Sequence, residues 1–81
     1  MTSPHIKQYR NRLGATQWMP STQLLKRLID NNEGFCLVCA HEQPNVEPDA
    51  VRQKCESCGE HKVYGAEKLA LMNLTFEAIL H

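Results

Sequence analysis

Four cysteines constrain this chain more than any other feature of its sequence. They form two Cys-x-x-Cys pairs, Cys36 with Cys39 and Cys55 with Cys58, and fifteen residues lie between the pairs. Two cysteines in such a pair can turn both sulfurs toward one point, and two such turns supply the four thiolates of a tetrahedral metal site. The spacing therefore predicts that all four cysteines bind one zinc ion.

Other chemistries fit the same pattern less well. Disulfides form in oxidising compartments, and a thioredoxin-like redox pair belongs at the start of a helix, where neither pair is expected here. Iron accepts the same four sulfurs, but zinc is the commoner occupant of tetrahedral sulfur sites. His41 and His61 follow the two pairs, and we interpret them as neighbours of the site because four cysteines complete the coordination shell.

The predicted zinc is structural rather than catalytic. Four thiolates leave no open position on the metal for a substrate. The sequence has no His-Glu-x-x-His motif, and it lacks the His-x-Glu and Pro-Cys-x-x-Cys of a zinc deaminase. It also shows no nucleophile–base pair and no phosphate-binding loop. We therefore expect a protein that is not an enzyme.

The length of the chain explains why a metal is needed. A chain of 81 residues buries only about 60% of its unfolded surface, and a core that small usually needs a metal, a disulfide or a partner. Binding of a structural zinc ion contributes on the order of 10 kcal/mol to folding. The sequence contains no run of 18 apolar residues, so we expect no membrane span. Its first residues lack the apolar stretch of a signal peptide. We expect a cytoplasmic protein that does not contact the membrane.

The predicted elements describe a small α+β fold, in which a four-cysteine zinc ribbon of short antiparallel strands is flanked by an N-terminal and a C-terminal helix. Residues 1–19 show no steady periodicity and are expected to form an irregular, basic arm. The remainder, 20–81, is expected to form a single zinc-ribbon domain. Its parts are a helix at about 22–32, the ribbon at 35–65 and a second helix at about 66–80.

Local signals set the ends of these elements. A hydroxyl near Ser21 is the expected N-cap of the first helix, and Gly34 is the expected left-handed residue after it. Strands are expected at 35–38, 50–54 and 61–64, with a loop at 42–49 because of its prolines and asparagine.

The region 35–65 resembles the zinc-ribbon fold group, in which a metal-binding turn, a hairpin, a second turn and a strand follow in that order. The longer run 34–71 resembles small zinc-ribbon proteins of tailed bacteriophages and prophages. The matching segments are Cys36-x-x-Cys39, Val46–Ala50, Cys55–Gly59 and Val63–Glu67. The resemblance implies the four cysteine ligands and a phage or bacterial cytoplasmic setting, and it implies no catalytic residue. Ala40 departs from the pattern, since ribbon turns often have glycine there, which predicts a less regular first turn.

Charge is distributed unevenly along the chain. Residues 1–29 contain five lysines and arginines and no acidic residue, whereas 30–81 contain four basic and nine acidic residues. A basic segment with aromatic rings can pair with phosphates and stack on bases. The nucleic-acid-binding candidates are Lys7, Tyr9, Arg10, Arg12 and Trp18. The alternative is a solvated tail with Trp18 folded onto the core, and the neutral net charge of the whole chain favours that alternative.

The C-terminal segment is the other candidate binding surface. As a helix it would be apolar nearly all round, which is usual where a helix is buried on more than one side. Either the rest of the chain or a partner would provide that cover. The protein-binding candidates are Leu69, Leu71, Met72, Leu74 and Phe76, and the same helix would also carry Ile79 and Leu80.

Two functional hypotheses follow from these features. The first is a small regulatory or inhibitory zinc protein of phage origin that binds a host or phage protein. The alternative is a nucleic-acid-associated zinc-ribbon protein that acts in transcription or replication. Both hypotheses allow a homodimer.

Overall fold

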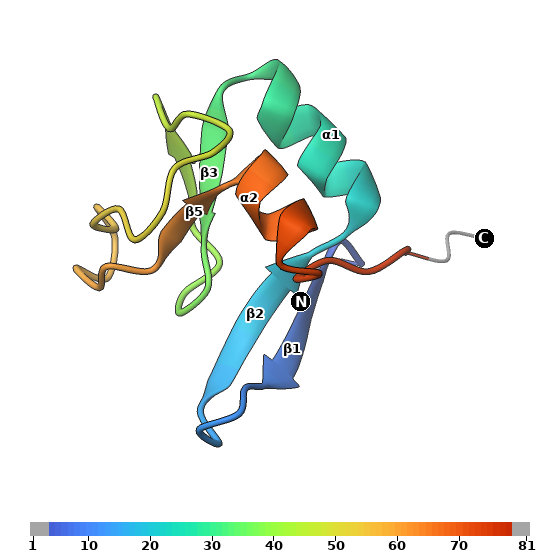
Figure 1. Ribbon diagram of the computed structural model, residues 1–81, viewed down its shortest axis with the longest axis vertical. Helices are drawn as coiled ribbons and strands as arrows, with labels where there is room; N and C mark the ends of the chain where they lie inside the picture. The colour runs from blue at the N-terminus through green and yellow to red at the C-terminus, as the bar shows by residue number, and fades with distance from the viewer. Residues whose placement is uncertain (1–3, 79–81) are drawn as a thin grey trace.

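The computed structural model describes residues 4–78 (Figure 1). Its elements are, in order, β1 (Ile6–Arg10), β2 (Thr16–Pro20), α1 (Thr22–Asp30), β3 (Glu33–Cys36), β4 (Glu42–Pro44), β5 (Val63–Gly65) and α2 (Ala66–Leu71). The strands β1 and β2 form an antiparallel hairpin, and a second antiparallel sheet has the strand order β4-β3-β5. Short antiparallel strands and two helices confirm the small mixed fold of helices and antiparallel strands that the sequence predicts.

The three-stranded sheet separates two buried clusters. Successive residues of a strand point to opposite faces, and directly paired residues share a face. The pair Phe35 and Tyr64 therefore faces the helices, where it packs with buried leucines of α1 and with Leu69 of α2. The pair Cys36 and Val63 faces the other way, toward the loop between the two cysteine pairs. Figure 1 shows both helices on one side of β3 and β5 and this loop on the other.

Helix α1 begins where the sequence predicts. The Ser21 hydroxyl accepts a hydrogen bond from the Leu24 N–H at 3.0 Å, which satisfies one of the free donors of the first turn. The helix buries Leu24, Leu25 and Leu28, and its other face is exposed. The prediction for its end is wrong by two residues, because Asn32 with φ +52° is the left-handed residue. An asparagine tolerates this conformation better than most residues.

Residues 4–19, the described part of the predicted arm at 1–19, are not irregular as the sequence predicts, since most of them belong to the β1–β2 hairpin. Ile6 pairs with Pro20 at one end, and Arg10 pairs with Thr16 at the other. The turn is closed by Asn11, whose side-chain oxygen accepts hydrogen bonds from the N–H groups of Leu13 and Ala15. The hairpin is also tied to the body, because the Trp18 N–H donates to the Leu37 carbonyl at 2.7 Å.

The second helix is shorter than the predicted 66–80. It ends at Leu71, and Asn73 follows in the left-handed region with φ +58°. The Asn73 N–H bonds to the Ala70 carbonyl and the Leu74 N–H to the Leu69 carbonyl, which is the Schellman pattern that ends a helix. Positions 79 and 80 of the predicted helix lie outside the described residues.

The chain after α2 runs as an extended segment beside the start of α1. The N–H of Thr22 donates to the Phe76 carbonyl, and the Phe76 N–H donates to the Pro20 carbonyl. The Gln23 side chain adds two hydrogen bonds to the backbone of Ala78, one from its amide nitrogen and one to its amide oxygen. These bonds to distant residues replace the helical bonds that periodicity alone would predict.

The ribbon strands also differ from the prediction. The first strand ends at Cys36 rather than at residue 38, because the turn that contains Cys36 and Cys39 begins there. The predicted loop 42–49 contains the short strand β4, and the predicted strand at 50–54 is reduced to a bridge between Gln53 and Val63. Among residues 4–78, no helix has the length and apolar character to cross a membrane.

Two glycines allow the loop after β4 to lie directly on the sheet. Gly34 of β3 pairs with Gly65 of β5, and both have side-chain directions toward this loop. A Cβ on Gly34 would lie 2.6 Å from Val46 Cγ1, and a Cβ on Gly65 would overlap the backbone of Glu47 and Pro48. Gly34 therefore allows the loop to pack closely against the strand, and it is not the helix-capping residue that the sequence predicts.

We predict that Gly65→Ala lowers the free energy of unfolding by about 3 kcal/mol, because the added methyl group must displace backbone rather than a flexible side chain. The matched control is Gly14→Ala in the hairpin turn, where no atom lies within 4 Å and the φ of +84° is the sole source of strain. That control should cost about 1 kcal/mol. Urea unfolding of both variants measures the difference, and equal losses would contradict the packing argument.

Candidate metal centre

The two cysteine turns have the same backbone geometry. In each turn the carbonyl of the first cysteine accepts a hydrogen bond from the N–H four residues on, Cys36 from Ala40 and Cys55 from Gly59, both at 2.9 Å. The first cysteine's own N–H donates to the carbonyl five residues on, at 3.0 and 2.8 Å. Equivalent turns point equivalent sulfurs to one place, and these two turns face each other.

Ala40 takes the same conformation as the glycine in the second turn. Its φ is +64°, and that of Gly59 is +80°. The prediction of a less regular first turn is therefore wrong. For a residue with a side chain, this left-handed conformation costs about 1–2 kcal/mol. The first turn keeps the regular geometry despite that cost.

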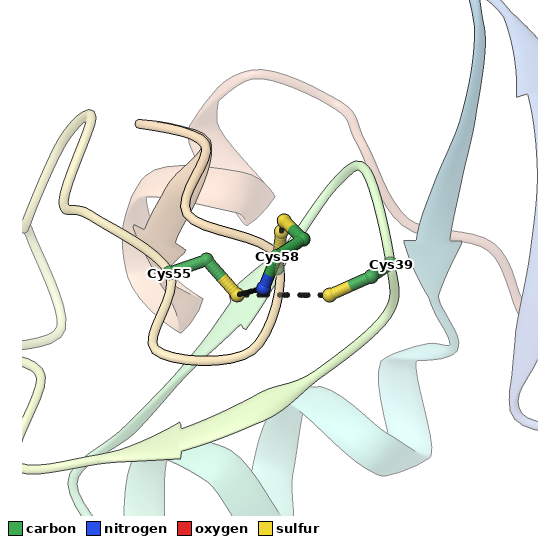
Figure 2. A group of neighbouring side chains, drawn as sticks. Cys39, Cys55 and Cys58 are labelled. Atoms are coloured by element: carbon green, nitrogen blue, oxygen red, sulfur yellow. Dashed lines mark hydrogen bonds between the residues drawn. The ribbon is translucent and has the colours of Figure 1, made fainter.

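The four sulfurs are arranged as a metal site requires. All four Sγ atoms lie within 4.8 Å of one another, with 3.7 Å between Cys36 and Cys58 and 3.6 Å between Cys39 and Cys55. Sulfurs bound about 2.3 Å from a tetrahedral zinc would lie about 3.8 Å apart. Figure 2 shows the labelled cysteines, Cys39 from one turn and Cys55 and Cys58 from the other, with their side chains directed into the space between the turns. The four free cysteines can therefore hold one metal ion.

One side of the cluster is buried and the other faces solvent. Cys36 and Cys55 are buried and pack with Val46 and Val63, whereas Cys58 is exposed. A site at the edge of an apolar cluster can be reached by a metal ion and still excludes water from two of its ligands.

The buried cysteines differ in their thiol chemistry in the metal-free chain. Burial raises the pKa of Cys36 to about 12, against the opposing effect of N–H groups in its own turn. Burial also acts to raise the pKa of Cys55, but hydrogen bonds outweigh it and lower that pKa to about 6. The donors are the N–H groups of Ser57 and Cys58, which lie 3.3 and 3.4 Å from Cys55 Sγ. Of the two buried cysteines, Cys55 is therefore the one with the lowered thiol pKa and Cys36 the one with the raised pKa.

Gln43 supports the second turn and is a residue that sequence reasoning missed. It is 7% exposed, and its position opposite Gly34 directs it to the metal side of the sheet. Its amide donates to the Lys54 carbonyl at 3.1 Å and accepts from the Glu56 N–H at 2.8 Å. These bonds fix the backbone on both sides of Cys55. No motif identifies such a glutamine, since a polar residue before Pro44 looks like part of a loop.

The nucleic-acid-binding candidates lie on the hairpin but do not share one face. Lys7 and Tyr9 lie on one face of β1, with Gln17 beside Tyr9 and bonded to its hydroxyl. Arg10 and Trp18 lie on the other face, where Trp18 is half-buried against the helical cluster. Among these candidates, the cations Lys7, Arg10 and Arg12 are all exposed. Lys7 Nζ also lies 5.8 Å from the centre of the Phe76 ring.

The protein-binding candidates are divided between the core and the surface. Leu69 is fully buried, and Leu74 and Phe76 are half-buried against the rest of the chain. Leu71 is 78% exposed and Met72 is 38% exposed at the end of α2. The structure thus leaves Leu71 and Met72 at the surface and uses the other three within the fold.

The fold and the cysteine cluster define a small mixed α/β protein with a candidate four-sulfur metal centre. Comparisons with models of protein families, with curated proteins and with solved structures found no match for this chain.

We predict that Gln43→Ala lowers the affinity for Zn²⁺ about tenfold or more, because it leaves the Glu56 N–H without its partner and loosens the second turn. Competition with a chromophoric chelator measures this affinity. The matched control is Gln53→Ala, since Gln53 is exposed and its amide donates to the nearby Val51 carbonyl. An unchanged affinity in Gln43→Ala would show that the turn holds its shape without this bond.

Proposed function

We propose that the metal is zinc and that its role is structural. The observation that carries this proposal is the closed set of four sulfurs, with 3.6 and 3.7 Å across the two turns. Four thiolates suit zinc and leave no coordination position for a substrate. Zinc would join two turns that are fifteen residues apart in the chain, so its binding free energy becomes folding free energy. A non-enzymatic role is consistent with this chemistry.

We further propose that the zinc-held domain is a regulatory or inhibitory module that binds a protein partner. Support comes from Leu71 and Met72, two adjacent apolar side chains exposed at the end of a short helix. An apolar helix end of this kind suits a groove or patch on another protein. The phage origin implied by the resemblance to small phage zinc ribbons stays a prediction and suggests bacterial proteins as the first partners to test.

A second candidate function is nucleic-acid binding by the hairpin. It is favoured by Lys7, Arg10 and Arg12, which are all exposed, and by the absence of acidic residues from positions 1–29. The division of these side chains between two faces of the hairpin argues against nucleic-acid binding. A groove that follows a nucleic-acid backbone has its cations along one surface.

We predict that Cys55→Ala prevents zinc binding and leaves the chain unfolded, because a site with three sulfurs loses most of the binding free energy that folds so small a core. Metal analysis and circular dichroism measure the two effects. In the wild-type protein, cobalt should give the intense thiolate-to-metal absorption of a tetrahedral four-sulfur site. Ser57→Ala, an exposed position in the same turn, is the control and should keep both fold and metal. A folded, metal-free Cys55→Ala protein would contradict the structural role.

We predict that the tagged, zinc-loaded protein captures a stoichiometric protein from bacterial lysate and that nuclease treatment leaves the complex intact. Changing both Leu71 and Met72 to serine should weaken capture about tenfold or more, because both apolar side chains then lose their contacts. Ile29→Ser is the matched control, since Ile29 is a 40% exposed apolar residue on α1. Loss of all captured material on nuclease treatment would favour the nucleic-acid function instead.

A further inference from the structure

The hydrogen-bond pattern of the hairpin shows which backbone groups of β1 point outward. In an antiparallel pair, residues alternate between those bonded to the partner strand and those directed away from it. The Ser21 N–H donates to the His5 carbonyl, and the Asn11 N–H donates to the Ala15 carbonyl. Both pairs fit the register of the hairpin, so the odd-numbered residues of β1 are the ones bonded to β2.

The same alternation places the N–H and C=O groups of Ile6, Gln8 and Arg10 on the outer edge of β1. On β2, two of the matching outward groups are bonded to other segments: the Trp18 N–H donates to the Leu37 carbonyl, and the Pro20 carbonyl accepts from the Phe76 N–H. For β1, no backbone bond to any segment other than β2 occurs within residues 4–78. The hairpin projects from the body with β1 on its outer side (Figure 1). An edge of this kind can accept an additional strand.

Charge indicates which strand would fit this edge. Lys7 and Arg10 are exposed, and residues 1–29 contain no acidic side chain that would neutralise them. A second copy of β1 would bring these cations together, and cations on an edge strand act against such pairing. An acidic strand would place carboxylates next to them, where opposite charges on paired strands are favourable.

We propose that the outer edge of β1 binds an extended, acidic segment of a partner protein as an added β-strand. This inference rests on the proposed function, the binding of a protein partner. Lys7 and Arg10 are three positions apart, so they lie on opposite faces of the strand. The partner residues beside them are also three positions apart, in either strand direction. The site therefore fits a segment with two acidic residues in that spacing.

The experiment selects peptides from a displayed random library on the zinc-loaded, full-length protein. The expected peptides carry two acidic residues three positions apart. Gln8→Pro removes one outward N–H without breaking the hairpin, since the Gln8 N–H is not bonded to β2 and proline is tolerated on an edge strand. This variant should bind the selected peptides at least about tenfold more weakly, through the lost bond and the clash of the ring with the added strand.

Two further variants make the result specific. Gln8→Thr keeps the outward N–H and should bind like the wild type, while Lys7→Glu combined with Arg10→Glu should lose the acidic peptides. Metal content and thermal midpoint check that each variant is folded. Selected peptides without acidic pairs, equal binding to Gln8→Pro, or no selected peptides at all would overturn the proposal.

Other outcomes assign the edge to a different occupant and also overturn the proposal. A dimer in sedimentation that Gln8→Pro disrupts would assign it to a second copy of the chain. Single-stranded DNA that binds the wild type and Gln8→Pro equally, but not the charge-reversed protein, would assign the cations to phosphate. If a captured protein partner is lost with the serine variant of Leu71 and Met72 and kept with Gln8→Pro, the proposed function survives and the edge inference fails.

Discussion

The convergence of four cysteine sulfurs on one point is the constraint on which the rest of the structure depends. The second cysteine pair can reach the first because β5 lies beside β3, with Val63 paired to Cys36, the first of the four cysteines. The second turn is then held on both sides of Cys55 by hydrogen bonds between its backbone and the Gln43 side chain, so the two turns face each other. A metal ion bound between the two turns would hold this arrangement of β3, β5 and the second turn, so metal binding and folding stabilise each other.

The three-stranded sheet also connects the metal side of the fold to the helical side. The loop that follows β4 rests on the paired glycines Gly34 and Gly65, close enough that a methyl group would not fit. From there the Pro48 carbonyl accepts a hydrogen bond from the Lys68 N–H in the first turn of α2. Because α2 has no side-chain cap, this loop carbonyl takes one of its free donors. The beginning of α2 therefore depends on a loop that belongs to the metal side of the fold.

Sequence reasoning succeeded where the signal is local and failed where distant backbone groups compete. The cysteine spacing and the Ser21 cap are local, and the structure has the sulfur cluster and the start of α1 as predicted. The hairpin was missed because β1 shows no alternation of apolar and polar residues, and β2 is bound by a carbonyl from the first cysteine turn. The length of α2 was overestimated because Thr22 and Gln23, more than fifty residues away, bond the segment that periodicity assigns to a helix.

The outer edge of β1 differs from the other strand edges in what covers it. The chain around Gln53 bonds along β5, the Leu37 carbonyl and Phe76 bond along β2, and β4 is short and ends in a proline that cannot donate. On β1, the cations Lys7 and Arg10 lie on an edge strand, where natural proteins place charge to prevent edge pairing. The same cations that repel another basic strand attract an acidic one, so protection from self-association and selection of a partner have a common physical cause.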